Sequence, residues 1–557
     1  MSNSHDNGLI FPTRDAVRPD RPCPELPSGW LNPVRAFAQQ ARETPSDVLI
    51  EDSLGQTATY GEAYISALAL ALHLKKLLKH QAYTGILLPP SRGGLIANIA
   101  VSMLGQVPIN LNYSGGDAPI NSAIDQTGLS VVLSTKKVVE KGGFKFNAQI
   151  LYLEDIVPQI SGWTKAGAWY LANLAPIDGI GVFLPGFDAK LEDTATIMFT
   201  SGSSGEPKGV ELTNANVLYN TMQQSAHARV GREVILGSLP YFHSYGYGVT
   251  LWASMLLHFK IIAHHNPLDA RGICETIEKH GVTMFATTPT FARNYLKRGS
   301  REQFKTVRML MLGSEKLKPE LARDIRQKLD IVPCEGYGTT ELSPVVSGCV
   351  NFEVASPKGG FVSGNREGSV GQVVPGTTIA IIDSVTGQAL PRGRANEGRI
   401  FVHGPQVMKG YYRKPGETGA VLRNGWYFTG DIGALDEDGF LYLTDRESRF
   451  AKVGPEMVPL VKVEAALRQL ANVDELSIAL CAVPDPTKGE KVVALYSADG
   501  INPSELTRAL AATGMHALWI PKANDFHKVP GPFPQTASGK LDLKAIRKTA
   551  LQLDGQG

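Results

Sequence analysis

Short apolar runs alternate with helix-like segments from residue 60 to residue 312, and this alternation restricts the chain to few architectures. Apolar residues recur at helical spacing from Tyr60 to Lys79 and again from Leu95 to Leu104. The apolar runs around and after them are four or five residues long, at positions 85–88, 130–133, 149–153, 283–286 and 308–312. Buried strands that alternate with helices predict an α/β domain with a largely parallel sheet.

The pattern changes after Gly359, where short alternating runs are separated by glycine-rich turns. Such runs lie at 378–382, 398–402 and 440–443, and they predict a smaller β-rich subdomain. Beyond Asp445 a helix-like stretch over 461–470 is followed by strand-like runs at 476–483 and 491–497. That order predicts a small α+β domain at the carboxyl terminus.

The chain is therefore expected to have three parts: an extended, proline-rich leader over 1–30, a large domain over 31–444 and a small domain over 445–557. The leader has no basic stretch followed by an apolar one, so it is not interpreted as a secretory signal. The longest apolar segments are interrupted before the ~18 residues that a membrane span needs. We expect a cytoplasmic protein, at most in peripheral contact with the inner face of a membrane.

Charge and cysteine content exclude several classes of function. The 557 residues include 55 Lys plus Arg and 53 Asp plus Glu, so no broad positive field is available to hold a nucleic acid. The 5 cysteines are widely spaced and form no C-x-x-C pair. Neither a disulfide framework nor a zinc cluster is indicated, and a reducing compartment fits best.

The segment from Thr194 to Thr213, TATIMFTSGSSGEPKGVELT, has the composition of a polyphosphate site. An apolar strand runs into a loop with hydroxyls, glycines and a lysine, and a second short strand follows. Glycines expose backbone N–H groups, hydroxyls donate hydrogen bonds, and lysine supplies a point charge. The spacing does not match G-x-x-x-x-G-K-[ST], and a flexible Gly/Ser loop is the alternative. The candidate residues are Thr200, Ser201, Gly202, Ser203, Ser204, Gly205 and Lys208.

A second segment, EGYGTTE at 335–341, places an aromatic residue between glycines and follows it with hydroxyls and a carboxylate. Tyr337 is suited to stack on a base, Thr339 to hold a phosphate, and Glu341 to ligate Mg²⁺, which prefers oxygen ligands. Taken alone, the segment could be a surface turn. Its candidate residues are Glu335, Gly336, Tyr337, Gly338, Thr339 and Glu341.

Two further residues stand in suggestive contexts. Asp431, within GWYFTGDIG at 425–433, is expected in a tight turn where it could accept hydrogen bonds from a ribose diol. Lys540, within PQTASGKL at 534–541, follows a Ser-Gly pair and could reach a site on another domain. The alternatives are a structural Asx cap for Asp431 and solvated surface for Lys540.

Together, in this order and separation, these four segments resemble the adenylate-forming (AMP-binding) superfamily, over about residues 31–550. The resemblance implies that a carboxylate attacks the α-phosphate of ATP, pyrophosphate leaves, and a phosphopantetheine thiol then attacks the acyl-adenylate. It also implies that the loop from Thr200 to Lys208 holds the β- and γ-phosphates, while Tyr337 stacks on adenine. Thr339 would bind the α-phosphate and Glu341 the Mg²⁺.

The resemblance assigns roles to other positions as well. Asp431 would bind the ribose, and Lys540 would bridge carboxylate and α-phosphate oxygens in the transition state. His243, within SLPYFHSYGYG, would lie near the acyl carboxylate, with a core histidine as the alternative. Arg446 would meet the nucleotide, close to a hinge at Ser448. The adenine-side turn would be Gly313, Ser314 and Glu315.

One branch of the superfamily is particularly similar: the acyl-acyl carrier protein synthetases fused to 2-acylglycerophosphoethanolamine acyltransferases. The similar segments are RFAKVGPEMV at 449–458, NLNYSG at 110–115 and GSEKL at 313–317. The acyltransferase of those fusions carries an H-x-x-x-x-D motif. The match at His264–Asp269 lies inside the synthetase region, and it is interpreted as a turn.

The sequence thus predicts an ATP- and Mg²⁺-dependent acid–thiol ligase that activates a medium- to long-chain fatty acid. The acceptor would be acyl carrier protein or CoA. Pro455 stands where the superfamily usually has a glycine, and it cannot donate a backbone hydrogen bond. That departure motivates one alternative, a fatty acyl-AMP ligase without efficient thioester formation. The other alternative is a non-catalytic protein that binds a nucleotide or a carrier.

Overall fold

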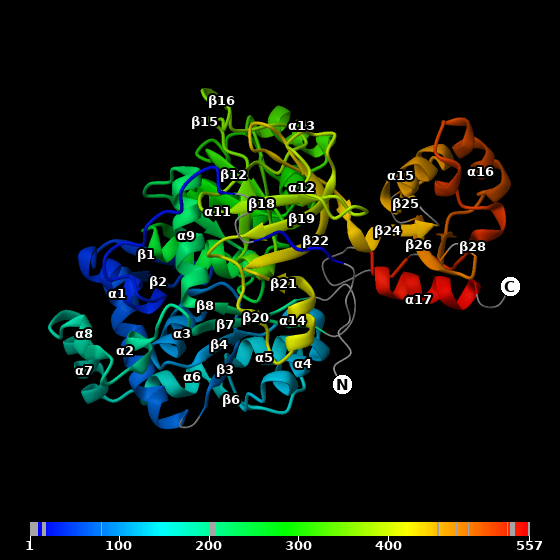
Figure 1. Ribbon diagram of the computed structural model, residues 1–557. Helices are drawn as coiled ribbons and strands as arrows, with labels where there is room; N and C mark the ends of the chain where they lie inside the picture. Colours follow the sequence, from blue (N-terminus) through cyan, green and yellow to red (C-terminus); the bar gives the residue numbers. More distant parts are fainter. Residues whose placement is uncertain are drawn as a thin grey trace. The chain divides into compact units, whose positions relative to one another are not determined.

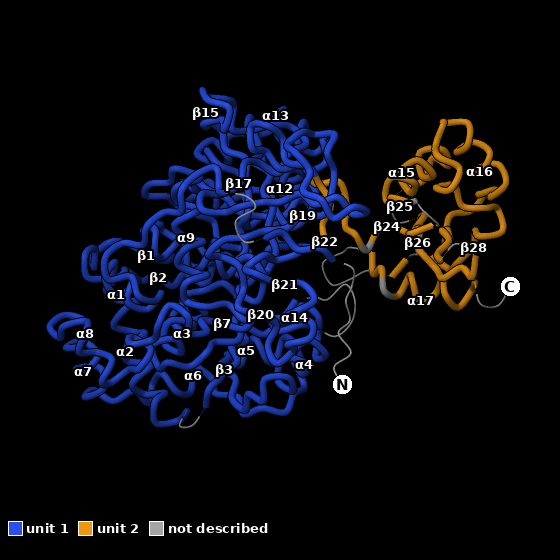
Figure 2. The backbone as a smooth tube through the Cα atoms, viewed as in Figure 1, with its two compact units in different colours: residues 1–201, 207–429, 434–442 blue, residues 202–206, 430–433, 443–557 orange. Residues whose placement is uncertain are grey.

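The computed structural model describes residues 9–13, 18–78, 81–200, 207–453, 456–474, 477–487, 489–531, 533–534 and 541–554. The chain forms two compact units (Figure 2). Unit 1 comprises residues 1–201, 207–429 and 434–442, and unit 2 comprises 202–206, 430–433 and 443–557. The assignment of 445–557 as a lid domain stays a prediction.

A nine-stranded sheet forms the centre of unit 1, in the order β17-β14-β13-β12-β11-β9-β10-β1-β2. Neighbouring strands from β1 to β13 in this order are parallel, and the strands at the two edges are antiparallel. The strands are β1 (Val48–Asp52), β2 (Thr57–Thr59), β9 (Val234–Gly237), β10 (Lys260–Ala263), β11 (Met284–Thr287), β12 (Met309–Leu312), β13 (Cys334–Gly338), β14 (Val345–Gly348) and β17 (Gln372–Val373).

A second sheet, in the order β4-β3-β5-β6, is parallel throughout. Its strands are β3 (Tyr83–Leu87), β4 (Val107–Asn110), β5 (Val131–Ser134) and β6 (Gln149–Tyr152). Helix α2 (Tyr60–Leu77) begins at a capping box, in which Thr59 and Glu62 satisfy each other's backbone N–H groups. The predicted α/β class with parallel sheets is confirmed.

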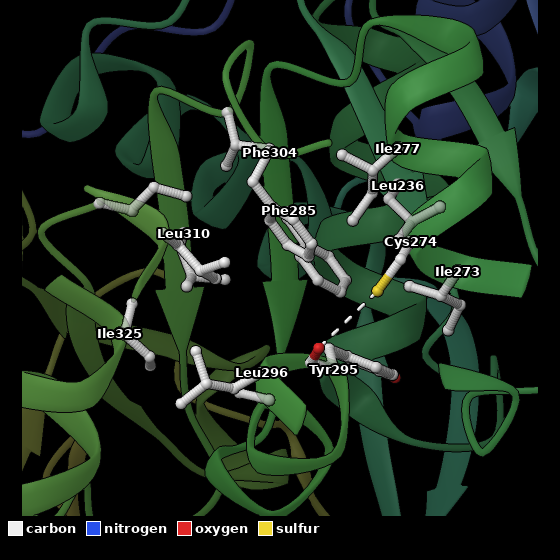
Figure 3. Close-up of a cluster of buried hydrophobic side chains, with 14 of the residues drawn as sticks. Leu236, Ile273, Cys274, Ile277, Phe285, Tyr295, Leu296, Phe304, Leu310 and Ile325 are labelled. Atoms are coloured by element: carbon white, nitrogen blue, oxygen red, sulfur yellow. Dashed lines mark hydrogen bonds between the residues drawn. The ribbon is translucent and has the colours of Figure 1, made fainter. Parts of the chain in front are cut away.

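An apolar cluster joins three helices to the central sheet (Figure 3). Phe285 and Leu310 project from strands, and Ile273, Ile277 and Ile325 project from the helices that cover them. Each fully buried side chain of this size contributes about 1.5–3 kcal/mol by leaving water. The helices are α11 (Ala270–His280), α12 (Pro289–Arg298) and α13 (Pro319–Leu329).

Helix α11 explains the H-x-x-x-x-D match. Asp269 caps the helix, because its Oδ1 accepts a hydrogen bond of 3.0 Å from the Gly272 N–H. His264 is buried, and its Nδ1 accepts a hydrogen bond from the Asn266 N–H at 3.3 Å. Both residues therefore shape a turn and a helix start, as the sequence interpretation expects.

The remaining helices of unit 1 are α1 (Pro33–Glu43), α3 (Arg92–Met103), α4 (Asp117–Thr127), α5 (Lys136–Gly142), α6 (Leu153–Ile156), α7 (Gly162–Asn173), α8 (Ile177–Ile180), α9 (Asn214–Ala228), α10 (Ser254–Leu256) and α14 (Pro415–Val421). A π-helix spans Gly246–Ala253. Figure 1 shows α3 to α6 around the second sheet. Within the described ranges, every helix is too short or too polar to cross a membrane.

The β-rich part of the chain combines strands from before and after Gly359, and residues 430–433 and 443–446 of its strands belong to unit 2. A three-stranded sheet has the order β20-β8-β7, and a larger one has the order β18-β19-β22-β21 with β23 beside β22. The bounds are β7 (Thr194–Phe199), β8 (Gly209–Thr213), β15 (Glu353–Ala355), β16 (Phe361–Ser363), β18 (Thr378–Ile382), β19 (Gly398–His403), β20 (Gly410–Tyr411), β21 (Leu422–Arg423), β22 (Trp426–Leu435) and β23 (Leu441–Arg446).

Unit 2 is an α+β structure with apolar side chains on both faces of its sheet. Ile478 and Leu480 of β26 pack with the cluster that holds α15 and α16, whereas Ala479, Cys481 and Val483 pack with α17. This alternation is the two-residue period of a strand buried on both sides. The elements are β24 (Phe450–Val453), β25 (Glu456–Pro459), β26 (Ile478–Asp485), β27 (Gly489–Tyr496), β28 (Phe526–Lys528), α15 (Leu460–Ala471), α16 (Pro503–Ala512) and α17 (Leu543–Asp554).

Candidate functional site

The loop predicted to hold phosphates connects two paired strands, β7 and β8. Phe199 pairs with Gly209, and the Thr200 N–H donates a hydrogen bond of 3.0 Å to the Lys208 carbonyl. Both ends of the loop are therefore fixed by the hairpin. The predicted residues between them, Ser201, Gly202, Ser203, Ser204 and Gly205, lie outside the described residues.

Lys208 is held at the end of this loop by two contacts. Its Nζ forms an ion pair of 2.7 Å with Glu417 and lies 4.8 Å from the centre of the Tyr411 ring. The hydrogen bond from Lys208 lowers the pKa of the Glu417 carboxyl. The lysine side chain remains about a quarter exposed, so its ammonium can still meet a ligand.

Tyr411 joins the phosphate loop to the Glu341 segment. It lies on β20, which pairs with β8, and its hydroxyl donates a hydrogen bond of 2.9 Å to Glu341 Oε1. Burial, and then the charge of Glu341, raise the pKa of the Tyr411 hydroxyl, so it stays a donor. Tyr411 is not among the site residues predicted from the sequence. Its only signal is a Tyr-Tyr pair after a glycine, which says nothing about a partner 70 residues away.

Glu341 keeps capacity for a further ligand. Tyr411 occupies Oε1, the Met408 N–H donates to the backbone carbonyl of Glu341 at 2.8 Å, and no described residue hydrogen-bonds to Oε2. The described part of the chain contains no group of three or more His, Cys, Asp or Glu side chains that could hold a metal ion. One carboxylate with an open oxygen suits Mg²⁺, which usually binds through one or two carboxylates, water and substrate phosphates.

Thr339 presents a polar atom that no described residue satisfies. Glu335, Gly336, Tyr337 and Gly338 lie on β13, and Thr339 follows at the cap of a 3₁₀ turn over Thr340–Leu342. The Thr339 hydroxyl is buried, and no described residue forms a hydrogen bond with it. A buried donor without a partner is costly unless a ligand supplies one. The arrangement fits a phosphate oxygen.

Thr340, which the sequence analysis passed over, has a different environment. Its Oγ1 lies 3.3 Å from Ser244 Oγ, so the chain provides its partner. His243, beside Ser244, is exposed, and its Nδ1 accepts a hydrogen bond of 3.2 Å from the Tyr245 N–H. The exposure contradicts the alternative of a core histidine. Tyr245 in turn donates to the Met311 carbonyl at the end of β12, at 3.3 Å.

Glu335 is a buried connection between β13 and the turn at 313–317. Glu335 is 8% exposed, and its Oε1 accepts a hydrogen bond of 2.8 Å from the Leu317 N–H. Burial raises the pKa of Glu335 to about 7. Tyr337 is similarly buried, at 9% exposure.

The turn predicted at the adenine side, at 313–315, packs closely against Tyr245. A Cβ on Gly313 would lie 3.3 Å from the Tyr245 ring, and Ser314 adopts a left-handed backbone with φ of 68°. Glu315 Oε2 accepts hydrogen bonds from the Thr290 N–H at 3.2 Å and hydroxyl at 2.6 Å, at the start of α12. The Glu315 carboxylate thus holds that helix start in place.

These segments gather at one edge of the central sheet. Thr287 pairs with Leu312, and Leu312 pairs with Glu335, so β11, β12 and β13 end close together. The carboxyl ends of parallel strands are where α/β folds bind ligands. Unit 1 therefore brings together the segments at 287–290, 313–315, 335–341 and 243–245.

Asp431 and Arg446 form a pair within unit 2. Asp431 is 5% exposed, and its Oδ1 lies 3.2 Å from Arg446 Nε. The predicted tight turn is wrong for Asp431, which lies in the middle of β22. The turn is at Asn424 and Gly425, both with positive φ, just before the strand begins. Lys540 and Pro455 lie outside the described residues, as does the Ser448 side chain.

Comparison with known proteins decides the family. A family model described as "AMP-binding enzyme" matches residues 37–412. The chain belongs to the AMP-binding enzyme family. Within that family, it is 36% identical over 361 residues to a long-chain-fatty-acid–CoA ligase of Bacillus subtilis (strain 168), a match that covers 63% of this chain and 60% of that ligase.

Other members of the AMP-binding family match over more of their length. A feruloyl-CoA synthase of Amycolatopsis is 28% identical over 525 residues, which covers 93% of this chain and 98% of that enzyme. A 4-coumarate–CoA ligase 5 of Oryza sativa subsp. japonica is 27% identical over 526 residues, or 92% and 93% of the two chains.

Solved structures support the same fold. ATP-bound MatB from Rhodopseudomonas palustris gives a TM-score of 0.72 at 23% identity and covers 93% of this chain and 99% of that one. The o-succinylbenzoate–CoA synthetase MenE from Bacillus subtilis, in complex with ATP and magnesium ion, gives 0.72 at 24% identity, with 91% and 98% covered.

Proposed function

We propose that this AMP-binding enzyme is an acid–thiol ligase. One oxygen of a carboxylate attacks the α-phosphorus of ATP, the bond to the bridging oxygen breaks, and pyrophosphate leaves. The sulfur of a phosphopantetheine thiol then attacks the acyl carbon, AMP leaves and the thiol proton is released. The observation that carries the proposal is that no described residue hydrogen-bonds to the Thr339 hydroxyl or to Glu341 Oε2, two residues further along the chain.

The chain's own residues would position ATP and the acid. Thr339 would donate its hydroxyl to the α-phosphate, and Lys208 would exchange its contact with Glu417 for the β- and γ-phosphates. Tyr411 would orient Glu341, which would hold Mg²⁺ with its other oxygen. When bound, Mg²⁺ would neutralise charge on the phosphates.

The remaining predicted roles fall to two residues paired within unit 2, to Lys540 and to His243. The pair of Asp431 and Arg446 would bind the ribose and meet the nucleotide. Lys540 would stabilise the charge that develops between the carboxylate and the α-phosphate. His243 is exposed at the same sheet edge as Thr340, where it would meet the acyl carboxylate.

We infer that the acid is a medium- to long-chain fatty acid, and the acceptor CoA or acyl carrier protein. The name of the Bacillus relative supports the fatty acid and CoA, and the segments at 110–115, 313–317 and 449–458 support acyl carrier protein. The names of the other relatives make hydroxycinnamic acids the competing substrate class.

The test is pyrophosphate release by the full chain with ATP, Mg²⁺ and a panel of acids from butyrate to palmitate, with 4-coumarate and ferulate alongside. We expect the highest kcat/KM with a fatty acid. Glu341→Gln should lower it on the order of a hundredfold, since losing a metal ligand removes several kcal/mol of charge stabilisation. Glu302→Gln, at an exposed ion pair with Lys305, is the matched control and should match the native chain.

No release with any acid would contradict the proposal and favour a nucleotide- or carrier-binding protein. Highest activity with 4-coumarate or ferulate would contradict the fatty acid. With the best acid, CoA and holo acyl carrier protein are then compared as acceptors. Active adenylation with failure of both acceptors would favour an acyl-AMP ligase without efficient thioester formation.

A further inference from the structure

A cavity of about 380 Å³ opens within unit 1, between residues 21–24 and the end of helix α9. Phe352, Pro375 and two residues of β15 complete its lining. Its size is at the lower end of the range for small-molecule pockets. Most of the lining is apolar, and the side chains with nitrogen atoms that line it are Arg21, His227 and Arg229.

This cavity is separate from the candidate functional site. Helix α9 begins directly after the hairpin of β7 and β8, and its 15 residues carry the chain about 22 Å along the helix axis. The cavity lies at the far end of that helix. The segments that gather at the edge of the central sheet contribute no residue to its lining. A ligand in this cavity would therefore be additional to ATP, the acid and the thiol.

Arg21 is fixed on one side and open on the other. Its Nη2 donates to the Val373 carbonyl and, at 2.9 Å, to Nδ1 of His227. His227 is 5% exposed, and its Nε2 donates to the Gly348 carbonyl at 2.7 Å, because a carbonyl can only accept. Burial, and then the charge of Arg21, lower the pKa of His227 to about 4, so the ring stays neutral. No described residue hydrogen-bonds to Nε or Nη1 of Arg21.

Arg229 brings a second guanidinium to the cavity. It caps α9 with a left-handed backbone, at φ of 48°, and its guanidinium lies 4.7 Å from the centre of the Phe352 ring. Glycine is the usual residue at such a helix end. The side chain is exposed, and no described carboxylate forms an ion pair with it. The arginine charge is therefore available to a ligand.

The carboxylates near these arginines do not line the cavity. Burial has the largest effect on the pKa of Arg21 and lowers it, while the charge of Asp20 raises it and that of Arg229 lowers it. Asp20 forms an ion pair with Arg392. Glu353 of β15 is exposed and is not part of the lining, which contains no Asp or Glu among the described residues. Two guanidiniums thus face one cavity without a carboxylate between them.

We propose that this cavity binds the phosphate group of a small phosphate monoester, with the organic part of the ligand against the apolar wall. A guanidinium fork donates two parallel hydrogen bonds to phosphate oxygens, and a phosphate dianion matches two guanidiniums in charge. The wall is formed by Pro22, Pro24, Pro375 and Phe352. The inference does not depend on the proposed function.

The experiment is isothermal titration calorimetry of the full chain at pH 8, where the phosphate is a dianion, without ATP. Phenyl phosphate should bind about tenfold more tightly than inorganic phosphate, because its ring leaves water against the apolar wall. Phenyl sulfate has the same shape and a single charge, and it should bind at least tenfold more weakly than phenyl phosphate. Equal binding of the two esters would overturn the phosphate assignment, and equal binding of phenyl phosphate and inorganic phosphate would overturn the role of the wall.

Variants place the ligand. Arg229→Gln should weaken the binding of phenyl phosphate by 10- to 100-fold, since it removes charge-assisted hydrogen bonds. Arg298→Gln, at an exposed arginine in the last turn of α12, is the matched control and should bind like the native chain. Arg21→Lys keeps a donor for His227 and loses the fork, so it should weaken binding at least fivefold. Thermal unfolding of each variant shows whether the fold is kept.

Lys208→Ala separates this cavity from the predicted phosphate loop, and it should bind phenyl phosphate like the native chain. Three outcomes would overturn the inference: no binding of phenyl phosphate to the native chain, equal binding by Arg229→Gln, or loss of binding in Lys208→Ala. The last would place the ligand at the phosphate loop. Binding of phenyl phosphate by a chain that releases no pyrophosphate with any acid would contradict the proposed function and leave this inference standing.

Discussion

Two glutamates, one in each unit, show how a scaffold carboxylate differs from one that is ready for a ligand. Glu464 of unit 2 is 2% exposed and saturated: Oε1 accepts from Arg449 and from the Leu480 N–H at 2.7 Å, and Oε2 accepts from Arg468 at 2.8 Å. Among the described residues, Glu341 of unit 1 has one side-chain hydrogen-bond partner, Tyr411. The protein satisfies the carboxylate that holds structure and leaves open the one that we propose binds Mg²⁺.

The comparison also explains the residue beside the predicted hinge. Arg449 stands next to Ser448. Its side chain is buried and donates to the Leu480 carbonyl at 3.2 Å as well as to Glu464. Arg449 therefore fastens the start of unit 2 to β26, a structural role within the unit.

The largest expected effect comes from breaking the saturated network. Glu464→Ala leaves Arg449 and Arg468 without a buried counter-charge, which should destabilise unit 2 by about 3–5 kcal/mol. Hydrogen exchange of the full chain, followed by mass spectrometry, would show this as faster exchange in α15 and β26. Asp499→Ala, at an exposed ion pair with Lys528, is the control and should change exchange little. Unchanged protection in Glu464→Ala would contradict the structural role.

Local patterns predicted the elements of the sheets, but they could not predict these contacts. The apolar runs at 130–133 and 283–286 became β5 and β11, because a strand buried on both faces is apolar throughout. Tyr411 meets Glu341 through pairing of β20 with β8, strands about 200 residues apart, which no local periodicity encodes. The glycines around Asp431 led to the wrong prediction of a tight turn there. The turn is at Asn424 and Gly425, before the strand that contains Asp431 begins.

A third glutamate, Glu335, sharpens the comparison because it is buried and no described arginine forms an ion pair with it. Its pKa of about 7 lies above the ordinary value of 4.5, so the folded chain keeps a proton that the unfolded chain loses. This contribution to stability is fully present below about pH 4.5 and is lost as pH rises through about 7.

Glu335→Gln keeps the acceptor for the Leu317 N–H and removes the titration. Between pH 5 and pH 8 the free energy of unfolding should therefore fall less in Glu335→Gln than in the native chain, by roughly 3 kcal/mol. Urea denaturation across this range measures the difference. Parallel pH profiles for the two proteins would show that Glu335 does not carry the titration.

The smallest expected change in stability distinguishes two adjacent threonines, Thr339 and Thr340, by whether a described residue hydrogen-bonds to the hydroxyl. Thr339→Val removes a buried hydroxyl that no described residue satisfies, so the free protein should keep or gain stability, while adenylation falls by about 10- to 100-fold. Thr340→Val removes the contact with Ser244 and should cost about 1 kcal/mol of stability. Thermal unfolding measures the stability of both variants, and pyrophosphate release measures their rate of adenylation. If Thr339→Val instead loses stability and keeps its rate, an unsatisfied hydroxyl is no guide to the ligand site in this enzyme.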